Sequence, residues 1–300
     1  MEKLFQHCLN GLAIGSIYAL IALGYTMVYG ILRLINFAHG DVYMIGAFSG
    51  YYLARAFHVT NDSSLGLSTA VLLLTMMICA ALGFVMERVA YRPLRRAPRL
   101  NALITAIGVS LFLEYTAQLI FGPDPKLFPT LVEMQPVASF GQVQLSNLQL
   151  LIFGVSLGLM MALRHFIMHT KVGRAMRALS FDFTTASLIG IPTDRIIAYT
   201  FMTGAALAGA AGILVGVMYP RIDPLMGIMP GLKAFVAAVL GGIGNFPGAV
   251  VGAFIMGLSE EMVVGYISST YRDALAFGIL ILILLARPAG LFGKSVPEKT

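Results

Sequence analysis

Long apolar runs are the feature that most constrains this chain. Several of them reach the roughly 18 to 20 residues that an α-helix needs to cross the hydrocarbon core of a bilayer. Of the 300 residues, 58% are hydrophobic and 11% are charged, against about 25% charged in soluble domains. No sustained ten-residue alternation marks the strands of a membrane β-barrel. The sequence therefore predicts an all-α, polytopic helical membrane bundle, with residues 1–300 as a single transmembrane domain.

Eight apolar runs predict membrane-spanning helices, and a ninth segment is shorter. The eight runs cover about residues 9–32, 41–57, 67–86, 101–121, 148–165, 196–218, 249–267 and 273–290. The ninth, about residues 231–243, is too short to cross unassisted. We interpret it as a half-helix or a re-entrant segment that protein shields from lipid. Nine crossings is the preferred count, and eight remains open.

Basic residues indicate the orientation. With the N-terminus outside and the C-terminus inside, 14 of the 20 Lys and Arg residues fall on the inner side and four on the outer side. Lys and Arg accumulate in the cytoplasmic loops of membrane proteins, so this bias supports the orientation. It also accounts for the net charge of +6 without a nucleic-acid partner. Cys8 and Cys79 lie in or beside different apolar runs and predict neither a disulfide nor a metal site.

Two loops stand out. The outer loop 122–147 is rich in Pro and Gly, and it either caps the pathway, meets an external partner or connects two spans passively.

In the inner loop 164–195, residues recurring at three- and four-residue steps predict one apolar stripe on a helix. These are Met176, Leu179, Phe183, Ala186 and Gly190, with Arg174 and Arg177 on another face. An amphipathic helix of this kind docks into a groove on another protein or lies flat on lipid, and the residues leave both readings open.

Small residues at four-residue spacing predict close helix packing, because helices in lipid associate through such stripes. Gly204, Ala208, Gly212 and Gly216 form one ladder, and Gly11, Gly15 and Ala19 form another. The glycines of "VLGGIGNFPGAVVGA" have a spacing one residue too long for a dinucleotide-binding loop, and no βαβ unit surrounds them. We interpret this segment as a sharp, close-packed turn between two helices, involving Gly241, Gly242, Gly244 and Gly248.

Polar residues in the tight connection between the first two runs are candidates for a solute pathway or gate. Asn36, His39 and Asp41 either line or close a path, provide a proton relay between His39 and Asp41, or stabilise an interhelical turn with Asn36 or Asp41 as N-cap. The residues alone leave these three readings open.

Acidic residues within the apolar runs are further candidates. A charge near the bilayer centre costs roughly 2.5 to 3.5 kcal/mol. Glu114 and Glu260 therefore either line a pathway or reach water near the outer interface. Adjacent helical residues point about 100° apart, so we expect at most one of Glu260 and Glu261 to face the interior fully. No nucleophile–base pair or metal-ligand set is evident, and "PAGLFGKS" lacks the first glycine and the following helix of a nucleotide-binding loop.

Several motifs occur in a fixed order: "INFAHGDVYMIGA", "ERVAYRPLRR", "LITAIGVSLFL", "GRAMRA", "ASLIGIPTDRIIA" and "KAFVAAVLGGIGNFPGAVVG". Together they resemble the shorter permease subunit of the high-affinity branched-chain amino-acid ABC importers, over about residues 10–292. The resemblance implies an ATP-driven, binding-protein-dependent importer of leucine, isoleucine or valine in the bacterial inner membrane, and not an enzyme. It implies a second permease, two cytoplasmic ATPases and a periplasmic binding protein as partners, with ATP bound by those partners and no cofactor in this chain.

The resemblance also implies a role for the inner loop. ABC permeases couple to the ATPase through a cytoplasmic helix, often with Glu-Ala-Ala and then a Gly four residues after the second Ala. At the corresponding positions this chain has Thr184, Thr185, Ala186 and Gly190, so the acidic residue of the pattern is absent. The resemblance favours ATPase docking on residues 173–192, through Arg174, Arg177, Phe183, Ala186 and Gly190. It makes a proton relay unnecessary, and residues 33–41 are then expected to form a polar structural corner beside the pathway.

Alternatives of a different class stay open. In the main alternative, the chain is a self-contained, ion-coupled secondary transporter or channel, with His39, Asp41, Glu114 or Glu260 carrying the ion coupling. Such transporters often show an internal repeat, and no convincing repeat is evident here. Within the resembling family, relatives that carry amides or urea and a homodimer in place of paired permeases also stay open.

Overall fold

The structure is a computed structural model that describes residues 2–59, 65–95, 97–141 and 143–293. Its helices are α1 (Glu2–Leu32), α2 (His39–Ala56), α3 (Leu65–Met86), the π-helix η1 (Glu87–Tyr91), the 3₁₀ turn η2 (Arg92–Leu94), α4 (Arg99–Phe121), α5 (Asn147–His169), α6 (Lys171–Phe181), α7 (Phe183–Leu188), α8 (Thr193–Met218), α9 (Ile228–Gly241), α10 (Phe246–Tyr266), the 3₁₀ turn η3 (Ser269–Tyr271) and α11 (Arg272–Ala286). The short strands are β1 (Lys126–Leu127), β2 (Pro136–Phe140), β3 (Val143–Ser146) and β4 (Arg221–Ile222). Arg96, Lys294 and Lys299, counted above on the inner side, lie outside the described residues.

All nine predicted segments are helical, but fewer of them meet the conditions for a membrane span. Among the described residues, seven helices are long and apolar enough to cross a membrane, against the eight or nine spans predicted. The two that do not qualify are α2, whose 18 residues include His39, Asp41 and Arg55, and α9, which has 14 residues. Both are largely buried in the bundle. Protein rather than lipid surrounds them, so their sequences need not be uniformly apolar.

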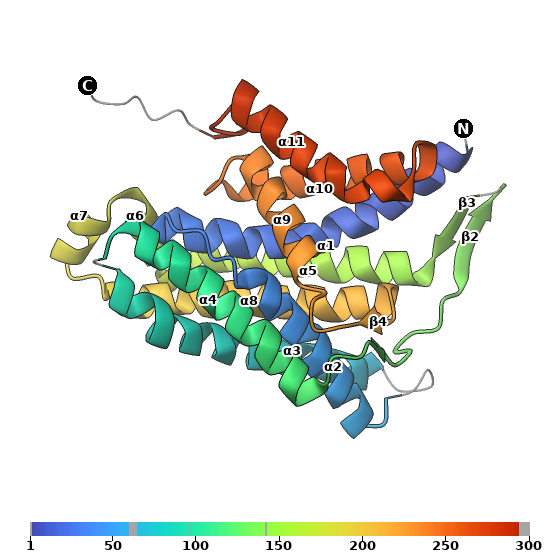
Figure 1. Ribbon diagram of the computed structural model, residues 1–300, viewed down its shortest axis with the longest axis horizontal. Coiled ribbons are helices and arrows are strands. Elements are labelled where there is room, and N and C mark those ends of the chain that lie inside the picture. The colour runs from blue at the N-terminus through green and yellow to red at the C-terminus, as the bar shows by residue number, and fades with distance from the viewer. Residues whose placement is uncertain (1, 60–64, 96, 142, 294–300) are drawn as a thin grey trace.

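Helix α1 lies at the centre of the bundle. It is buried from Gly11 to Val28 with the exception of Leu12, and it packs against α5, α8, α9 and α10 (Figure 1). On α1, Gly11 and Gly15 face the backbone of Leu258 and Phe254 on α10. Because these glycines have no side chain, the two helix backbones lie in direct contact along this seam.

The glycine ladder of α8 lies against two other helices. Gly204 faces Gly24 of α1, and Gly212 faces the backbone of Tyr43 and Ala47 on α2. The fully buried Ala208 lies between them on the same ladder, and Gly216 packs against the ring of Phe128. One small-residue face of α8 therefore holds α1 and α2 at backbone-to-backbone distance.

The turn between α9 and α10 closes against the end of the described chain. Gly242 and Gly244 have φ values of +102° and +92°, which glycine adopts without strain. Gly241 and Gly248 face each other's backbone across the turn, and the side chain of Asn245 caps α10 by accepting from the Gly248 N–H. The N–H groups of Leu291 and Phe292 donate to the carbonyls of Leu240 and Gly241, at 2.8 and 3.1 Å. Two helices and the segment after α11 thus meet at one tight corner.

The predicted loop 122–147 is not structureless, because it contains three strands. Strands β2 and β3 form an antiparallel hairpin, and β1 pairs with β4, which follows α8. The hairpin joins the start of α1, where Gln6 Oε1 accepts from the Gln144 N–H at 2.8 Å. Figure 1 shows this hairpin and the N-terminus at one end of the molecule, with α6 and α7 at the opposite end.

Substitution of Gly212 tests whether glycine contacts hold the bundle together. In Gly212→Ala, the new methyl group meets the backbone of Tyr43 and Ala47. We expect overpacking to lower stability by about 1–3 kcal/mol, measured as a lower melting temperature by size-exclusion chromatography after heating in detergent. Gly158→Ala on α5 is the matched control, since its methyl group enters open space and improves helix propensity by up to about 1 kcal/mol. Equal melting temperatures for the two variants would contradict the packing role.

Candidate functional site

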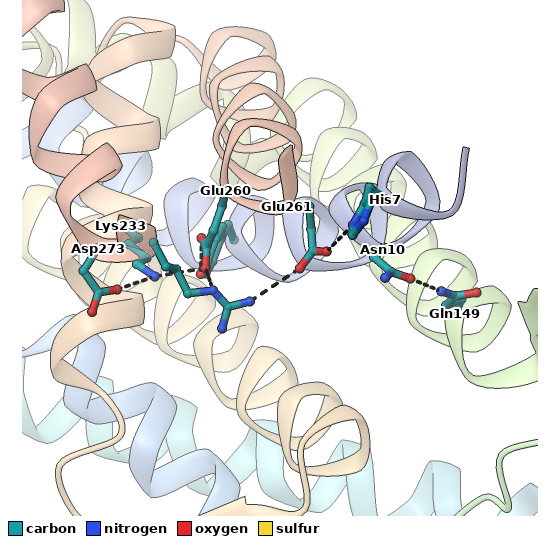
Figure 2. A network of polar contacts seen from close by, with 9 residues as sticks. His7, Asn10, Gln149, Lys233, Glu260, Glu261 and Asp273 are labelled. Atoms are coloured by element: carbon teal, nitrogen blue, oxygen red, sulfur yellow. Dashed lines mark hydrogen bonds and ion pairs between the residues drawn. The ribbon is translucent and has the colours of Figure 1, made fainter. Parts of the chain in front are cut away.

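A network of charged side chains lies inside the bundle, centred on Glu260 of α10. Its Oε1 atom lies 3.0 Å from Lys233 Nζ and 2.6 Å from Arg272 Nε, and its Oε2 accepts from the Tyr18 hydroxyl at 2.9 Å (Figure 2). The Arg272 Nε–H is not aligned for a hydrogen bond, so this contact is an ion pair. Lys233 Nζ also lies 2.8 Å from Asp273 Oδ1. Helices α1, α9, α10 and α11 each contribute to this network.

Glu261, the next residue on α10, extends the network toward α1. Its Oε1 lies 3.4 Å from Arg272 Nη2, and its Oε2 lies 3.5 Å from His7 Nδ1. The side chains of Glu260 and Glu261 are 1% and 7% exposed. The expectation that at most one of the pair faces the interior is therefore wrong. Although the two point in different directions, α1 and α11 together cover both sides of α10.

Pairing makes this burial of charge tolerable. An isolated charge away from water is strongly unfavourable, and buried charges therefore need partners. Each of the two cations, Lys233 and Arg272, lies between two carboxylates. No group of three or more potential metal ligands was found among the described residues. The network therefore presents charges of both signs in one place, held by four helices.

A cavity of about 290 Å³ adjoins the network. Lys233, Glu260, Arg272 and Asp273 form its charged side, and Tyr18 and Tyr43 also line it. Arg272 and Asp273 begin α11, and their side chains are 35% and 48% exposed. They are the accessible members of the network, whereas Lys233 and Glu260 are almost fully buried.

The polar corner between α1 and α2 is built differently from the prediction. Helix α2 begins at His39, and no side chain caps it, so neither Asn36 nor Asp41 is its N-cap. Instead, Asn36 Oδ1 accepts from the Tyr91 hydroxyl of η1 at 2.6 Å. His39 packs edge-on against the ring of Tyr25, with centroids 4.8 Å apart.

Asp41 and Glu114 belong to a second polar cluster, between α2 and α4. Asp41 Oδ2 accepts from the Ser110 hydroxyl at 2.5 Å. Ser110 and Glu114 are four residues apart on α4 and so share one face, and the Glu114 carboxyl also lies within hydrogen-bonding reach of Asp41. Of the predicted pathway residues, Asp41 and Glu114 are thus brought together. Glu260 belongs to the other network, and Asp41 and His39 face different partners.

The predicted single helix of the inner loop is wrong, because the chain breaks at Asp182 into α6 and α7. The Asp182 carboxylate accepts from the N–H groups of Thr184 and Thr185, at 2.9 and 3.1 Å, and from the Thr185 hydroxyl at 2.6 Å. The bond from the Thr185 hydroxyl, with those from the N–H groups, lowers the pKa of Asp182. Asp182 is a side-chain N-cap, which starts a new helix in a new direction.

Because of this break, the residues of the predicted apolar stripe differ in their exposure. Met176, Leu179 and Ala186 are buried within the chain's own fold, while Phe183 and Gly190 are exposed. The most exposed apolar side chains of the segment are Phe181, Leu188 and Ile189, none of which was predicted. Phe181 and Ile189 line a shallow groove of about 540 Å³ together with Arg174 and Arg177. Gly190 has a φ of +85° and follows the end of α7.

The sequence reasoning missed Lys233, Arg272, Asp273 and Tyr18 as members of a site. Lys233 offered a signal, since a lone lysine in an apolar segment is expected to pair with an acidic group such as Glu260. Arg272 and Asp273 looked like ordinary charges at the edge of a span. Tyr18 lies 242 residues from Glu260 in sequence, and nothing local to it indicates the contact.

Comparison with known proteins places the chain in a transport family. A model for the permease component of branched-chain amino acid transport systems matches residues 7–284. The chain belongs to this permease family. It is 45% identical over 298 residues to the high-affinity branched-chain amino acid transport system permease LivH of Salmonella typhimurium, covering 98% of this chain and 97% of that relative. It is 44% identical to BraD, the corresponding permease of Pseudomonas aeruginosa, with the same coverage.

A more distant similarity connects the family to a second permease. The chain is 26% identical over 308 residues to LivM of Salmonella typhimurium, covering 94% of this chain and 69% of LivM. LivM and LivH are both named as permease proteins of a high-affinity branched-chain amino acid transport system. The family is one of transport permeases, in line with the seven helices of the described residues that are long and apolar enough to span a membrane.

Loss of Lys233 tests whether the buried network depends on paired charges. In Lys233→Met, Glu260 loses one of its two cationic partners while staying buried, and breaking such a pair typically costs about 3–5 kcal/mol. We expect a large drop in melting temperature, and partial recovery in the double variant Lys233→Met/Glu260→Gln, where the carboxylate is neutralised. Lys3→Met, at the exposed start of α1, is the control. A melting temperature for Lys233→Met equal to that of the wild type would rule out the dependence.

Proposed function

We propose that this chain is a permease subunit of an ATP-driven, binding-protein-dependent importer of branched-chain amino acids. The observation that carries the proposal is its 45% identity to LivH over nearly the whole of both chains. Leucine, isoleucine and valine are the proposed substrates. The chain itself binds no ATP in this proposal, and the energy comes from partner subunits.

The proposed partners are a second permease, two cytoplasmic ATPases and a periplasmic binding protein. The similarity of this chain to both LivH and LivM supports a pair of related permeases. The ATPases and the binding protein follow from the ABC importer family. The two permeases together would enclose the solute pathway, with the chain in the bacterial inner membrane.

We place the α6–α7 end of the molecule in the cytoplasm and the β2–β3 end in the periplasm. Arg88, Arg92, Arg174 and Arg177 belong to the connections on the α6–α7 side, where the positive-inside rule puts basic residues. The exposed Phe181, Leu188 and Ile189 offer an apolar docking surface there. The ATPases would bind this surface and the neighbouring Arg174, Arg177, Phe183 and Gly190, while the buried Ala186 would support α7 from within the fold.

Ion-coupled transport by this chain alone is less well supported. A proton relay through His39 and Asp41 needs the two groups to exchange a proton directly or through a short chain. In the structure His39 faces Tyr25, and Asp41 faces Ser110. We therefore propose that the α1–α2 corner is structural, with Asn36 joined to η1 through Tyr91.

Co-purification and transport test this proposal together. The chain is tagged, extracted from native membranes in mild detergent, and its partners are identified by mass spectrometry. We expect two ATPases and a second permease, and ATP-dependent uptake of tritiated leucine into proteoliposomes once the binding protein is added. Purification of the chain alone, with leucine uptake driven by an ion gradient, would overturn the proposal.

Gly190 tests the docking surface. Its φ of +85° suits glycine and is tolerated by asparagine, but it strains a β-branched residue by about 1–3 kcal/mol. We expect Gly190→Val to displace the adjacent Ile189 and to reduce leucine uptake severalfold, with normal amounts of protein in the membrane. Gly190→Asn is the matched control and should transport at nearly the wild-type rate. Full uptake by Gly190→Val would remove Gly190 from the docking assignment.

A further inference from the structure

The cavity beside Glu260 has two chemically different sides. One side carries Lys233, Glu260, Arg272 and Asp273. The rest of the lining is mostly apolar and consists of Ile14, Ile17, Val215, Met229 and Pro230 with the tyrosines Tyr18, Tyr43 and Tyr219. Charged and aliphatic side chains therefore line the same cavity, which favours a ligand with a charged end and an aliphatic end.

The charged side presents both signs to the cavity. The guanidinium of Arg272 and the carboxylate of Asp273 come from adjacent residues, and both are partly exposed. Behind them, Lys233 and Glu260 are buried and paired. A ligand with one positive and one negative group can thus meet an opposite charge at each group, and it adds no net charge to a region of low dielectric constant.

The size of the cavity restricts the ligand further. Its volume of about 290 Å³ corresponds to roughly ten water molecules at about 30 Å³ each. That space is sufficient for a small metabolite. Specific ligand sites combine such an apolar lining with a few polar groups that fix the orientation.

We propose that this cavity binds a zwitterionic α-amino acid with an aliphatic side chain. The α-carboxylate accepts hydrogen bonds from the Arg272 guanidinium, and the α-ammonium donates to the carboxylate of Asp273, the accessible acidic group of the cavity. The aliphatic side chain lies between Ile14, Ile17 and Val215. This assignment rests on the proposed function, which supplies branched-chain amino acids as the solute, and it locates a binding site for them within this chain.

Arg272 has a particular role in this arrangement. It is ion-paired with both Glu260 and Glu261, so an incoming carboxylate competes with them for the guanidinium. The planar guanidinium has five N–H donors and can serve more than one carboxylate at once. The carboxylate of the amino acid therefore shares Arg272 with Glu260 and Glu261, and no charge is left unpaired.

Photolabelling with photoleucine, a leucine analogue with a diazirine in its side chain, tests the site directly. The transporter is purified with its native partners and illuminated, and the labelled peptides are identified by mass spectrometry. We expect label on the peptides that contain Ile14–Tyr18, Val215 or Met229, because the diazirine takes the place of the aliphatic side chain. Excess L-leucine should abolish this labelling. The labelling should persist with isopentylamine, which lacks the carboxylate, and with 4-methylpentanoate, which lacks the ammonium.

Variants separate the cavity from nonspecific labelling. Arg272→Gln should reduce the labelling of these peptides by about tenfold, the effect of losing one charge-assisted hydrogen bond. Arg221→Gln is the matched control, because Arg221 is an exposed arginine of β4 that does not line the cavity. If Arg272→Gln does not fold, Val215→Phe supplies the same test by filling the aliphatic side of the cavity.

The two proposals fail in different ways. Wild-type transporter that takes up no branched-chain amino acid overturns the proposed function. If leucine and photoleucine are taken up normally, two labelling results overturn the cavity assignment alone. One is the absence of label from these peptides, and the other is label that persists unchanged in Arg272→Gln or Val215→Phe. Label that L-leucine displaces and that both variants lose supports the assignment.

Discussion

Direct contact between helix backbones at glycines is the constraint on which the rest of this structure depends. Inside lipid, apolar side chains gain little by leaving one apolar environment for another, so helices associate through close packing. Here Gly11 and Gly15 let α1 touch α10, and Gly212 lets α8 touch α2. Without such contacts α1 could not be enclosed on all sides. The enclosure of α1 in turn buries polar groups beside it, and these must find partners within the protein.

The charged network follows from that enclosure. Tyr18 reaches Glu260 because α1 and α10 lie backbone against backbone. Lys233 reaches Glu260 because the glycine turn after α9 folds α10 back beside it, and the segment after α11 packs onto the same turn. Side chains of α1, α9 and α11 meet at the carboxylate of Glu260 on α10. Packing contacts at other points along these helices bring each side chain there. The network is therefore a consequence of the glycine contacts rather than an independent source of the fold.

The sequence predicts the helices well because the signal for each is local. An apolar run of sufficient length, or a ladder such as Gly204 to Gly216, is complete within one segment. The break at Asp182 was missed because three- and four-residue periodicity continues through it, although an Asp at this position is itself a capping signal for the helix that follows. The pairing of Lys233 with Glu260 could not be predicted in detail, because it depends on how α9 and α10 cross. The resemblance to a permease family indicated the function, but it did not indicate this network.

Helix α8 connects the two ends of the molecule physically. Near its start, Asp194 pairs with Arg92 and Arg95, the latter at 2.6 Å, and Arg95 also pairs with the buried Glu87 of the π-helix. Near its other end, Val215 lines the cavity beside the charged network. The 26 residues between Thr193 and Met218 span about 39 Å at 1.5 Å per residue. One continuous helix therefore joins the ion pairs of Asp194 to the lining of the cavity. If ATPases bind the α6–α7 end, as proposed above, α8 is the shortest covalent path from the docking surface to the cavity.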